Sequence, residues 1–312
     1  MAGAPDVDVV VVGAGLAGLI AARTLQRAGC SVSVVEARPR VGGRIEDEVR
    51  PDGTVMALGG QFIGPGQDRM YELVAELGLK TFPTHVEGDS VLLLGGRRVR
   101  VSGSVPRANP LVLADVAQAL VRLDRLAAKV PVDAPWTAPR AEILDGQTLA
   151  GWLRRNVRSA RGRALLEGVF EVTEAADPAD VSLLFSLWAI SSGGGISHAL
   201  QTSGGSQQDR IDGGPHQVPA GLAAQVGDAV QLDWPVRAVT QDGDGVTAHG
   251  PAGATVRGRR LIMALAPTLA GRIDYSPTLP GNRDQLTQRA AMGAVIKCQA
   301  VYERPWWRDD GL

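Results

Sequence analysis

The feature that most constrains the fold is a cluster of glycines in residues 13–18, which joins an apolar run to a helical pattern. The apolar run, residues 9–12, is typical of a buried parallel strand. Gly13 permits a tight turn, Gly15 lets the backbone approach a pyrophosphate, and Gly18 allows the helix to pack closely on the strand. The helix N-terminus then faces the negative charge. This arrangement predicts a strand, a turn and a helix that bind a dinucleotide.

A second apolar run, residues 31–35, ends at Glu36. An acidic residue about 20 positions after the glycines is where a partner for a ribose hydroxyl belongs. In the loop that follows, Gly43 lets the chain pass close to a bulky ligand, and Arg44 has a planar guanidinium that suits phosphate. An ordinary solvated loop of arginine and glycine is the alternative interpretation.

Length and charge exclude several classes of protein. The chain has 312 residues, enough for a large core and two domains. Its 32 lysines and arginines nearly balance 33 aspartates and glutamates, so no basic field indicates nucleic acid. No apolar stretch reaches the roughly 18 residues that a membrane span needs. The first apolar run also lacks the basic start of a signal peptide, and we expect a cytoplasmic setting.

The cysteines and histidines show no spacing typical of a metal site. Cys30 and Cys298 lie far apart in the sequence, so no disulfide framework is expected. The histidines have no carboxylate or thiol partner at ligand spacing; they are His85, His198, His216 and His249. We expect neither a metal nor a nucleophilic triad.

The order of the predicted elements indicates an α/β domain that is interrupted by an insertion. We predict a Rossmann-like, doubly wound parallel sheet formed by residues 1–82 and 213–276. Its later elements are a helix over residues 220–226 and three strands, over residues 230–232, 236–240 and 260–265. A helix over residues 67–77 ends at Gly78. A substrate domain, mainly helical with an antiparallel sheet, occupies residues 83–212 and 277–312.

Within the insertion, residues 90–94 and 97–101 flank Gly95-Gly96, a two-residue hairpin signal. Residues 110–192 have mostly helical spacing. Residues 191–206 are rich in serine and glycine, and we predict a mobile loop there.

Lys297 is the residue for which we predict a chemical role. The apolar pattern of residues 294–302 predicts a strand, in which Lys297 shares a face with Val295, Gln299 and Val301. A lysine on an apolar face is unexpected, because lysine is seldom fully buried. From the pattern alone, a solvated strand face is the alternative.

Taken in order, these segments resemble the flavin monoamine oxidase family, the FAD-dependent amine oxidases. The resemblance extends over nearly the whole chain and rests on several separated motifs. They are VVGAGLAGL, VVEARPRVGGR, ALGGQFIGPGQDRMYELVAELGL, GGSQQDRIDGG, VQLDWPVRAV and RAAMGAVIKCQAVYERPWWRDDGL.

The resemblance implies an FAD site. The pyrophosphate would be held by Gly13, Ala14, Gly15, Ala17 and Gly18, with Glu36 on the adenosine ribose. Ala37, Arg38, Gly43 and Arg44 would line the same cofactor path. Gly59, Gly60, Gln61 and Phe62 match the segment that runs beside the isoalloxazine ring, and Val236 matches a backbone contact at the adenine end.

The resemblance also implies residues for chemistry and substrate. Lys297 matches a lysine that holds a water beside flavin N5 and assists reoxidation by oxygen. Gln207 matches a glutamine near the substrate, with Gln208 as the alternative. Ala199 falls where a gating side chain separates the entrance from the substrate cavity.

The implied reaction is oxidative deamination of primary amines or polyamines. A neutral amine loses the equivalent of a hydride to flavin N5, and water hydrolyses the imine to an aldehyde and ammonia. Oxygen then reoxidises the flavin and is reduced to hydrogen peroxide. Two alternatives are a non-catalytic flavoprotein remnant or interaction protein and an NAD-dependent dehydrogenase. Relatives continue past Leu312, so we expect an incomplete substrate domain, in a fragment or in an inactive truncated product.

Overall fold

The computed structural model describes residues 6–94, 96–102 and 109–312, which form two compact units. The first unit comprises Met1–Gln61, Arg69–Thr81 and Ile211–Met292, and the second comprises Phe62–Asp68, Phe82–Arg210 and Gly293–Leu312. The predicted first domain ended at residue 276, whereas this unit continues to Met292. The difference arises because Thr287 is buried, with its Cβ 2.9 Å from the position of a Cβ built on Gly271.

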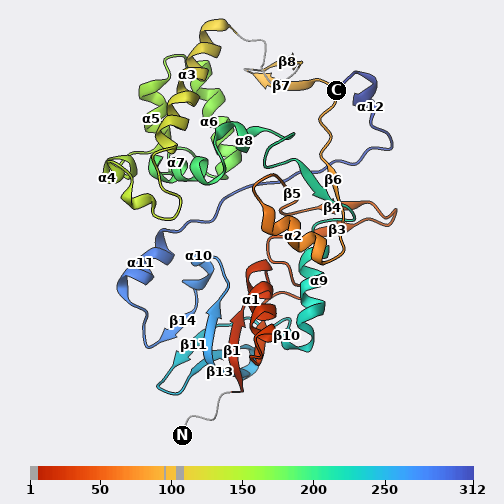
Figure 1. Ribbon diagram of the computed structural model, residues 1–312, viewed down its shortest axis with the longest axis vertical. Coiled ribbons are helices and arrows are strands. Elements are labelled where there is room, and N and C mark those ends of the chain that lie inside the picture. The colour runs from red at the N-terminus through yellow and green to blue at the C-terminus, as the bar shows by residue number, and fades with distance from the viewer. Residues whose placement is uncertain (1–5, 95, 103–108) are drawn as a thin grey trace. The chain divides into compact units, whose positions relative to one another are not determined.

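A seven-stranded sheet forms the centre of the first unit, in the order β10-β2-β1-β13-β12-β11-β14 (Figure 1). Strands β10, β2, β1 and β13 run parallel, β12 runs antiparallel between β13 and β11, and β14 is parallel to β11. The bounds are β1 (Val7–Val12), β2 (Val32–Val35), β10 (Val230–Gln231), β11 (Ala238–Gln241), β12 (Val246–His249), β13 (Thr255–Met263) and β14 (Asp274–Ser276). The predicted α/β class with a parallel sheet is confirmed.

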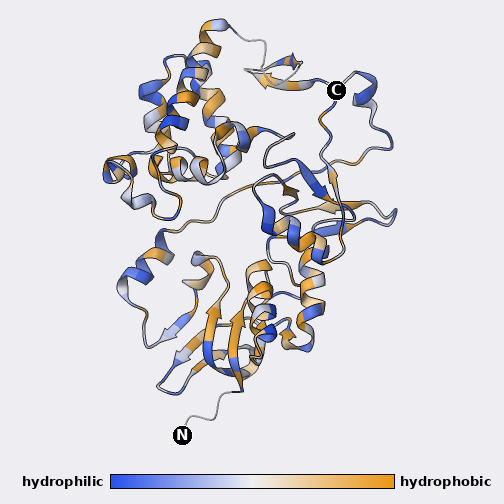
Figure 2. Cartoon of the chain, viewed as in Figure 1, coloured by the Kyte–Doolittle hydropathy of each residue, from blue (hydrophilic) through white to orange (hydrophobic). Residues whose placement is uncertain are grey.

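The valine runs explain why β1 and β2 lie inside this sheet and not at its edge. Val10, Val11 and Val34 are fully buried, as expected for parallel strands that are covered on both faces. Figure 2 shows β1 and the end of β13 in the hydrophobic colour. Because β1 pairs with β2 on one side and with β13 on the other, the strand order reverses at β1. Ligands of open α/β sheets bind at the carboxyl ends of strands at such a point.

Helices and a hairpin complete the first unit. Helix α1 packs on β1 and β2 and against α9, and its Arg23 forms an ion pair with Glu76 of α2 at 3.1 Å. The bounds are α1 (Leu16–Arg27), α2 (Asp68–Glu76), α9 (Gln217–Val226), η2 (Gly227–Ala229), η3 (Pro251–Gly253), α10 (Pro267–Ala270), α11 (Gly281–Arg289), β3 (Asp47–Val49) and β4 (Val55–Ala57). Asp68, the first residue of α2, is assigned to the second unit.

The second unit is mainly helical. Its helices are α3 (Pro110–Ala127), η1 (Pro135–Thr137), α4 (Ala141–Asp145), α5 (Leu149–Asn156), α6 (Ala160–Glu174), α7 (Leu183–Ser192), α8 (Ile196–Leu200) and α12 (Trp306–Asp309). The N-cap side chains of Asn109, Thr148, Ser159 and Ser182 each accept a backbone N–H of the helix that follows. Each such cap contributes about 1 kcal/mol. The helices enclose a core that includes Leu123, Leu149, Leu153, Leu183 and Leu187, all fully buried.

Two small β-sheets contain the remaining strands. The hairpin of β7 (Ser90–Leu94) and β8 (Arg97–Val101) confirms the predicted strands. Gly96 of its turn has φ +77°, and Gly95 lies outside the described residues. The strands β5 (Phe62–Ile63), β9 (Asp209–Ile211) and β6 (Thr81–Pro83) form a three-stranded sheet.

Three details differ from the predicted elements. Residues 191–206 contain the short helix α8, which begins at Ile196, a buried residue of the helical core. Strand β11 begins at Ala238 and not at residue 236, and β12 was not predicted. The strand predicted over residues 294–302 is not formed. None of the helices in the described ranges combines the length and apolar composition that a membrane crossing requires.

Candidate functional site

The turn after β1 has a conformation that only glycine adopts easily. Gly13 has φ +106°, and a Cβ built there would lie 2.8 Å from the carbonyl oxygen of Ala264. The backbone N–H of Gly13 donates to the carbonyl of Val35 at 2.8 Å. The turn is therefore held at the carboxyl ends of β1 and β2.

The next two glycines differ in what surrounds them. A Cβ on Gly18 would lie 1.9 Å from the carbonyl oxygen of Gly13, so the side-chain hydrogen of glycine is what allows helix α1 to approach the turn. A Cβ on Gly15 would have no atom within 4 Å. Gly15 is the N-cap of α1 and offers no side-chain cap, and the exposed Ala17 lies in the first turn. The first N–H groups of α1 are thus available to an anion in front of Gly15.

Glu36 follows β2 and turns its carboxylate toward the glycine turn. The side chain is buried, and its two oxygens accept the N–H of Ala14 at 2.8 Å and of Arg38 at 3.0 Å. Its backbone N–H donates to Gln231, and its carbonyl accepts the N–H of Trp234 at 2.7 Å. The carboxylate is fixed in place and retains lone pairs for a further donor, such as a ribose hydroxyl.

The arginine and glycine loop lies directly against the same turn. The N–H of Gly42 donates to the carbonyl of Ala14 at 2.9 Å, and a Cβ on Gly43 would lie 3.4 Å from the Cα of Gly15. Guanidinium groups of Arg38 and Arg40 donate to the carbonyl of Gly43 at 3.2 and 3.1 Å. Ala37, next to Arg38, is exposed. The loop therefore brings positive charge to the glycine turn, where an anion is expected.

Arg44 connects this loop to the segment that contains Gly59 and Gly60. The carbonyl of Arg44 accepts the N–H of Gly60 at 3.2 Å, and a Cβ on Gly59 would lie 2.0 Å from that same carbonyl oxygen. The Arg44 side chain is exposed, and within the described residues it makes no hydrogen bond or ion pair. Gln61 is half-buried at the end of this segment. The close backbone contact explains why glycine is needed at residue 59.

Val236 lies in the segment that leads to β11. This segment begins near Trp234, whose N–H donates to the carbonyl of Glu36. Val236 packs against the buried cluster of Val10, Val12, Val35 and Trp234. The N–H of Asp233 donates to the carbonyl of Arg38 at 3.1 Å, so residues 233–236 run beside the end of β2. This position is consistent with a backbone contact to the base of a dinucleotide.

Two residues that support the loop were not predicted from the sequence. Asp47 accepts the backbone N–H of His216 at 2.8 Å, and the His216 ring lies 3.2 Å from the carbonyl of Val41. A Cβ on Gly214 would lie 2.2 Å from the carboxylate of Asp47. These contacts hold the arginine and glycine loop in place at Val41. The glycine pair before His216 was the available signal, because a side chain at Gly214 would collide with the Asp47 carboxylate.

The remaining predicted residues belong to the second unit. Phe62 is the exposed first residue of β5, opposite Arg210, and Ala199 is half-buried in α8. Gln208 bonds within its own loop, to the N–H of Gly204 and to Asp209, both at 3.1 Å.

The half-buried side chain of Gln207 makes no hydrogen bond to the described residues. Of the two glutamines, Gln207 is therefore the one available to a ligand.

Lys297 lies in an extended and exposed segment of the second unit. The predicted strand was wrong, because a strand needs a neighbour to pair with its backbone, and no described residue forms a ladder with residues 294–302. Val295 and Val301 are 71% and 48% exposed, so no apolar face is formed. The segment is attached at its start, where the N–H of Ala294 donates to the carbonyl of Ala175 at 2.9 Å.

The residues of the first unit fit a dinucleotide. Open space in front of Gly15, uncapped N–H groups of α1, nearby arginines and the buried Glu36 carboxylate occur together at the carboxyl ends of β1 and β2. This combination provides donors for a pyrophosphate and an acceptor for a ribose. Among the described residues, no group of three or more histidine, cysteine, aspartate or glutamate side chains is arranged to hold a metal.

Comparisons with known proteins agree with this geometry. The family model for flavin containing amine oxidoreductases matches residues 16–312. A probable flavin-containing monoamine oxidase A of Dictyostelium discoideum is 38% identical over 306 residues, which cover 97% of this chain and 67% of that protein. Putrescine oxidase bound to putrescine has a TM-score of 0.91 at 36% identity, covering 98% of this chain and 68% of its own.

Cyclohexylamine oxidase from Brevibacterium oxydans has a TM-score of 0.86 at 35% identity, with 91% of this chain and 63% of the oxidase covered. The chain thus spans about two thirds of the length of such relatives. With its parallel sheet, its glycine turn and a family match over nearly the whole chain, the protein belongs to the flavin-containing amine oxidoreductases.

Proposed function

We propose that the protein oxidatively deaminates primary aliphatic amines or polyamines to an aldehyde, ammonia and hydrogen peroxide. As a member of this family, the protein has FAD as its cofactor. The proposal for the substrate is supported by two similar structures, putrescine oxidase and cyclohexylamine oxidase, whose names specify primary aliphatic amines. Both are more than one third identical to this chain.

The residues of the first unit would hold the adenosine and pyrophosphate half of the cofactor. N–H groups of the glycine turn and of the first turn of α1 would bind the pyrophosphate, and Glu36 would accept a ribose hydroxyl. Arg38 and Arg44 would supply positive charge beside the phosphates. The backbone at Val236 would contact the base, and Gly59 and Gly60 would let the chain pass along the flavin.

FAD supplies the redox chemistry when it is bound, which is two-electron oxidation of the amine with oxygen as the final acceptor. The chain must bind a neutral amine and exclude competing water. We assign Gln207 to the substrate, since its amide is not used within its own loop, and Ala199 to the passage that leads to it. Lys297 would hold a water through its ammonium group at the point of oxygen reaction.

The observation that carries the proposal is the position of the Glu36 carboxylate. It is buried, it is fixed by the N–H of Ala14 inside the glycine turn, and the loop of residues 38–44 is docked on that turn. An acidic residue held there suits a ribose with free hydroxyls, as in FAD.

The test is to purify the chain with added FAD and to measure visible flavin absorbance, followed by peroxide release with a panel of amines. We expect bound flavin, and peroxide from putrescine and cyclohexylamine above the rate with a matched alcohol. Bound flavin without peroxide from any amine would contradict the proposed reaction while leaving the cofactor site intact. Protein without flavin would contradict both.

A second candidate function is a flavoprotein without catalysis that acts by association. The observation in its favour is the exposure of Val295 and Ile296, at 71% and 91%, beside Lys297. Large exposed apolar side chains in one segment are typical of an interaction surface. Amine-dependent peroxide release would exclude this reading, and stable oligomers without turnover would support it.

A further inference from the structure

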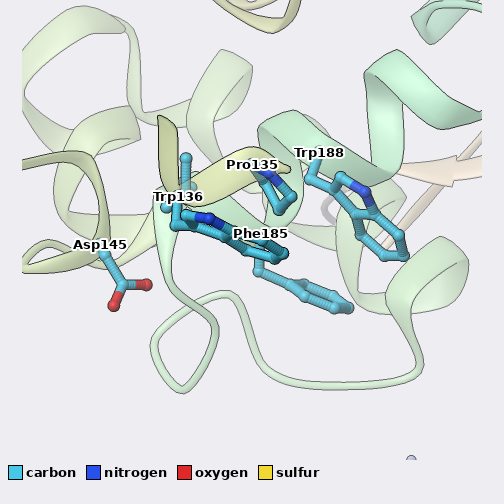
Figure 3. A pocket seen from close by; sticks show the side chains of 6 residues that line it. Pro135, Trp136, Asp145, Phe185 and Trp188 are labelled. Atoms are coloured by element: carbon cyan, nitrogen blue, oxygen red, sulfur yellow. The ribbon is translucent and has the colours of Figure 1, made fainter. Parts of the chain in front are cut away.

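The helical unit has an aromatic pocket on its surface, with a volume of about 360 Å³. It is formed by η1, the end of α4 and the first part of α7, and none of these belongs to the candidate flavin site. Figure 3 shows five of the lining residues with their labels; the full set is Pro135, Trp136, Asp145, Leu184, Phe185 and Trp188. Pockets for small ligands begin at roughly 300 Å³. The volume therefore suits a small molecule.

The aromatic rings of the pocket are held by the helical core and by a tight turn. Trp188 packs against the core, and its indole N–H donates to the carbonyl of Val132 at 2.9 Å. The Phe185 and Trp188 ring centroids lie 5.7 Å apart. Trp136 is 71% exposed, and its 3-10 turn is closed by a bond from the N–H of Ala138 to the carbonyl of Pro135. The pocket thus presents ring surfaces to solvent from a fixed framework.

The single charged group among the lining residues is the carboxylate of Asp145. It is exposed, and no described arginine or lysine forms an ion pair with it. The faces of indole and phenyl rings carry negative potential, so rings and carboxylate together disfavour an anion. A neutral apolar ligand would remove water from the carboxylate without giving it a partner.

We propose that this pocket binds a small organic cation, an alkylammonium or arylalkylammonium ion. Its apolar part would lie on the rings of Trp136, Phe185 and Trp188, and its nitrogen would lie beside Asp145. A cation over an aromatic face gains energy that a neutral molecule of the same shape does not. The site is independent of the proposed amine oxidation, since it shares no residue with the flavin site.

The probe for a test is benzyltrimethylammonium, whose nitrogen has no lone pair and therefore cannot react as an amine substrate. The full FAD-loaded chain is titrated by calorimetry, with benzyl alcohol as the neutral counterpart. We expect one saturable site for the cation. Asp145→Asn should weaken it by about three- to tenfold, and the exposed Asp180→Asn, outside the pocket, should not.

Variants of Trp136 separate a cation site from a general apolar site. Because the side chain is largely exposed, Trp136→Leu is expected to fold, to keep apolar area and to lose the preference for the cation over benzyl alcohol. Trp136→Phe should restore most of that preference.

Three results would overturn the proposal. The first is equal affinity of Asp145→Asn and Asp180→Asn for the cation. The second is binding that perturbs the flavin absorbance and survives Asp145→Asn, which places the probe at the flavin site. The third is a chain that is dimeric by sedimentation, becomes monomeric on Trp136→Leu and never binds the cation, which makes the pocket a contact between copies.

Discussion

The glycine turn after β1 and the segment around Lys297 differ in where their contacts come from. The turn is bonded to Val35 at the end of β2, to Glu36 and to Gly42, and its glycines allow backbones to approach within van der Waals contact. Residues 294–302 are attached at Ala294 and then continue as an exposed chain without a paired strand. A turn whose bonding partners all belong to one unit is held in place within that unit, whereas a strand forms only if a neighbouring strand pairs with it.

The largest effect is expected at Gly18, where the contact in the turn is tightest. Gly18→Ala would place a Cβ 1.9 Å from the carbonyl oxygen of Gly13 and should destabilise the first unit by about 3 kcal/mol or more. Gly168→Ala is the matched control, because that Cβ meets no atom within 4 Å in helix α6 and should stabilise by less than about 1 kcal/mol. Urea unfolding measures both, and equal midpoints would contradict the tight packing at Gly18.

The next largest effect concerns the carboxylate that contacts the turn. Glu36→Ala removes the acceptor for Ala14 and for a ribose hydroxyl, and it should weaken FAD binding by about tenfold or more. Glu48→Ala, an exposed glutamate of β3, is the control. Fluorescence titration with FAD gives both dissociation constants. If the two variants bind FAD equally well, Glu36 is a structural residue only.

The role of Lys297 in the second unit is tested by a substitution that should not change the stability of the protein. Lys297→Met alters an exposed side chain, so the free energy of unfolding should change by less than about 0.5 kcal/mol. We expect slower reoxidation of the reduced flavin by oxygen, with amine-dependent reduction largely retained. Stopped-flow absorbance separates the two half-reactions, with Lys129→Met as the control. Equal loss in both half-reactions would argue against a role limited to oxygen.

The smallest effect concerns Glu174, which precedes the residue that anchors Ala294. Burial raises the pKa of the Glu174 carboxyl above its usual value of 4.5. A raised pKa in the folded state means that the stabilising protonated form is present at low pH and is lost as pH rises through that pKa. Glu174→Gln should therefore remove a decline in stability above about pH 4.5, by less than about 1 kcal/mol. Thermal unfolding against pH measures it, with the exposed Glu171→Gln expected to keep the wild-type profile.

The same contrast explains what could be predicted from the sequence. Gly18 and Glu36 were interpretable because each acts through partners that the motif itself supplies, and the helical unit was visible in its apolar spacing. The close contact of Gly13 with Ala264 could not be predicted in this way, because Ala264 lies far away in the sequence. Helix α8 was missed because its buried residue, Ile196, packs on a core formed by other helices. The strand around Lys297 was predicted from alternation alone, which specifies a face and no partner strand.

Asp47 and His216 show a further limit. They lie 169 positions apart, and their bond supports the loop at Val41 without any local pattern that links them. Only the fold brings such pairs together. Residues that hold a ligand-binding loop in place are therefore the part of a site that sequence patterns predict least well.

The most direct test of the cofactor site is a titration of the wild-type chain and of Gly15→Val with FAD. A Cβ on Gly15 meets no atom within 4 Å and its φ of −74° suits any residue, so the variant should fold with little change in stability. The added side chain would occupy the space where the pyrophosphate approaches the backbone. The structure predicts that the wild-type chain binds FAD and that the folded variant does not. Equal affinity of the two chains, or a wild-type chain that takes up no FAD, would contradict the assignment of the glycine turn.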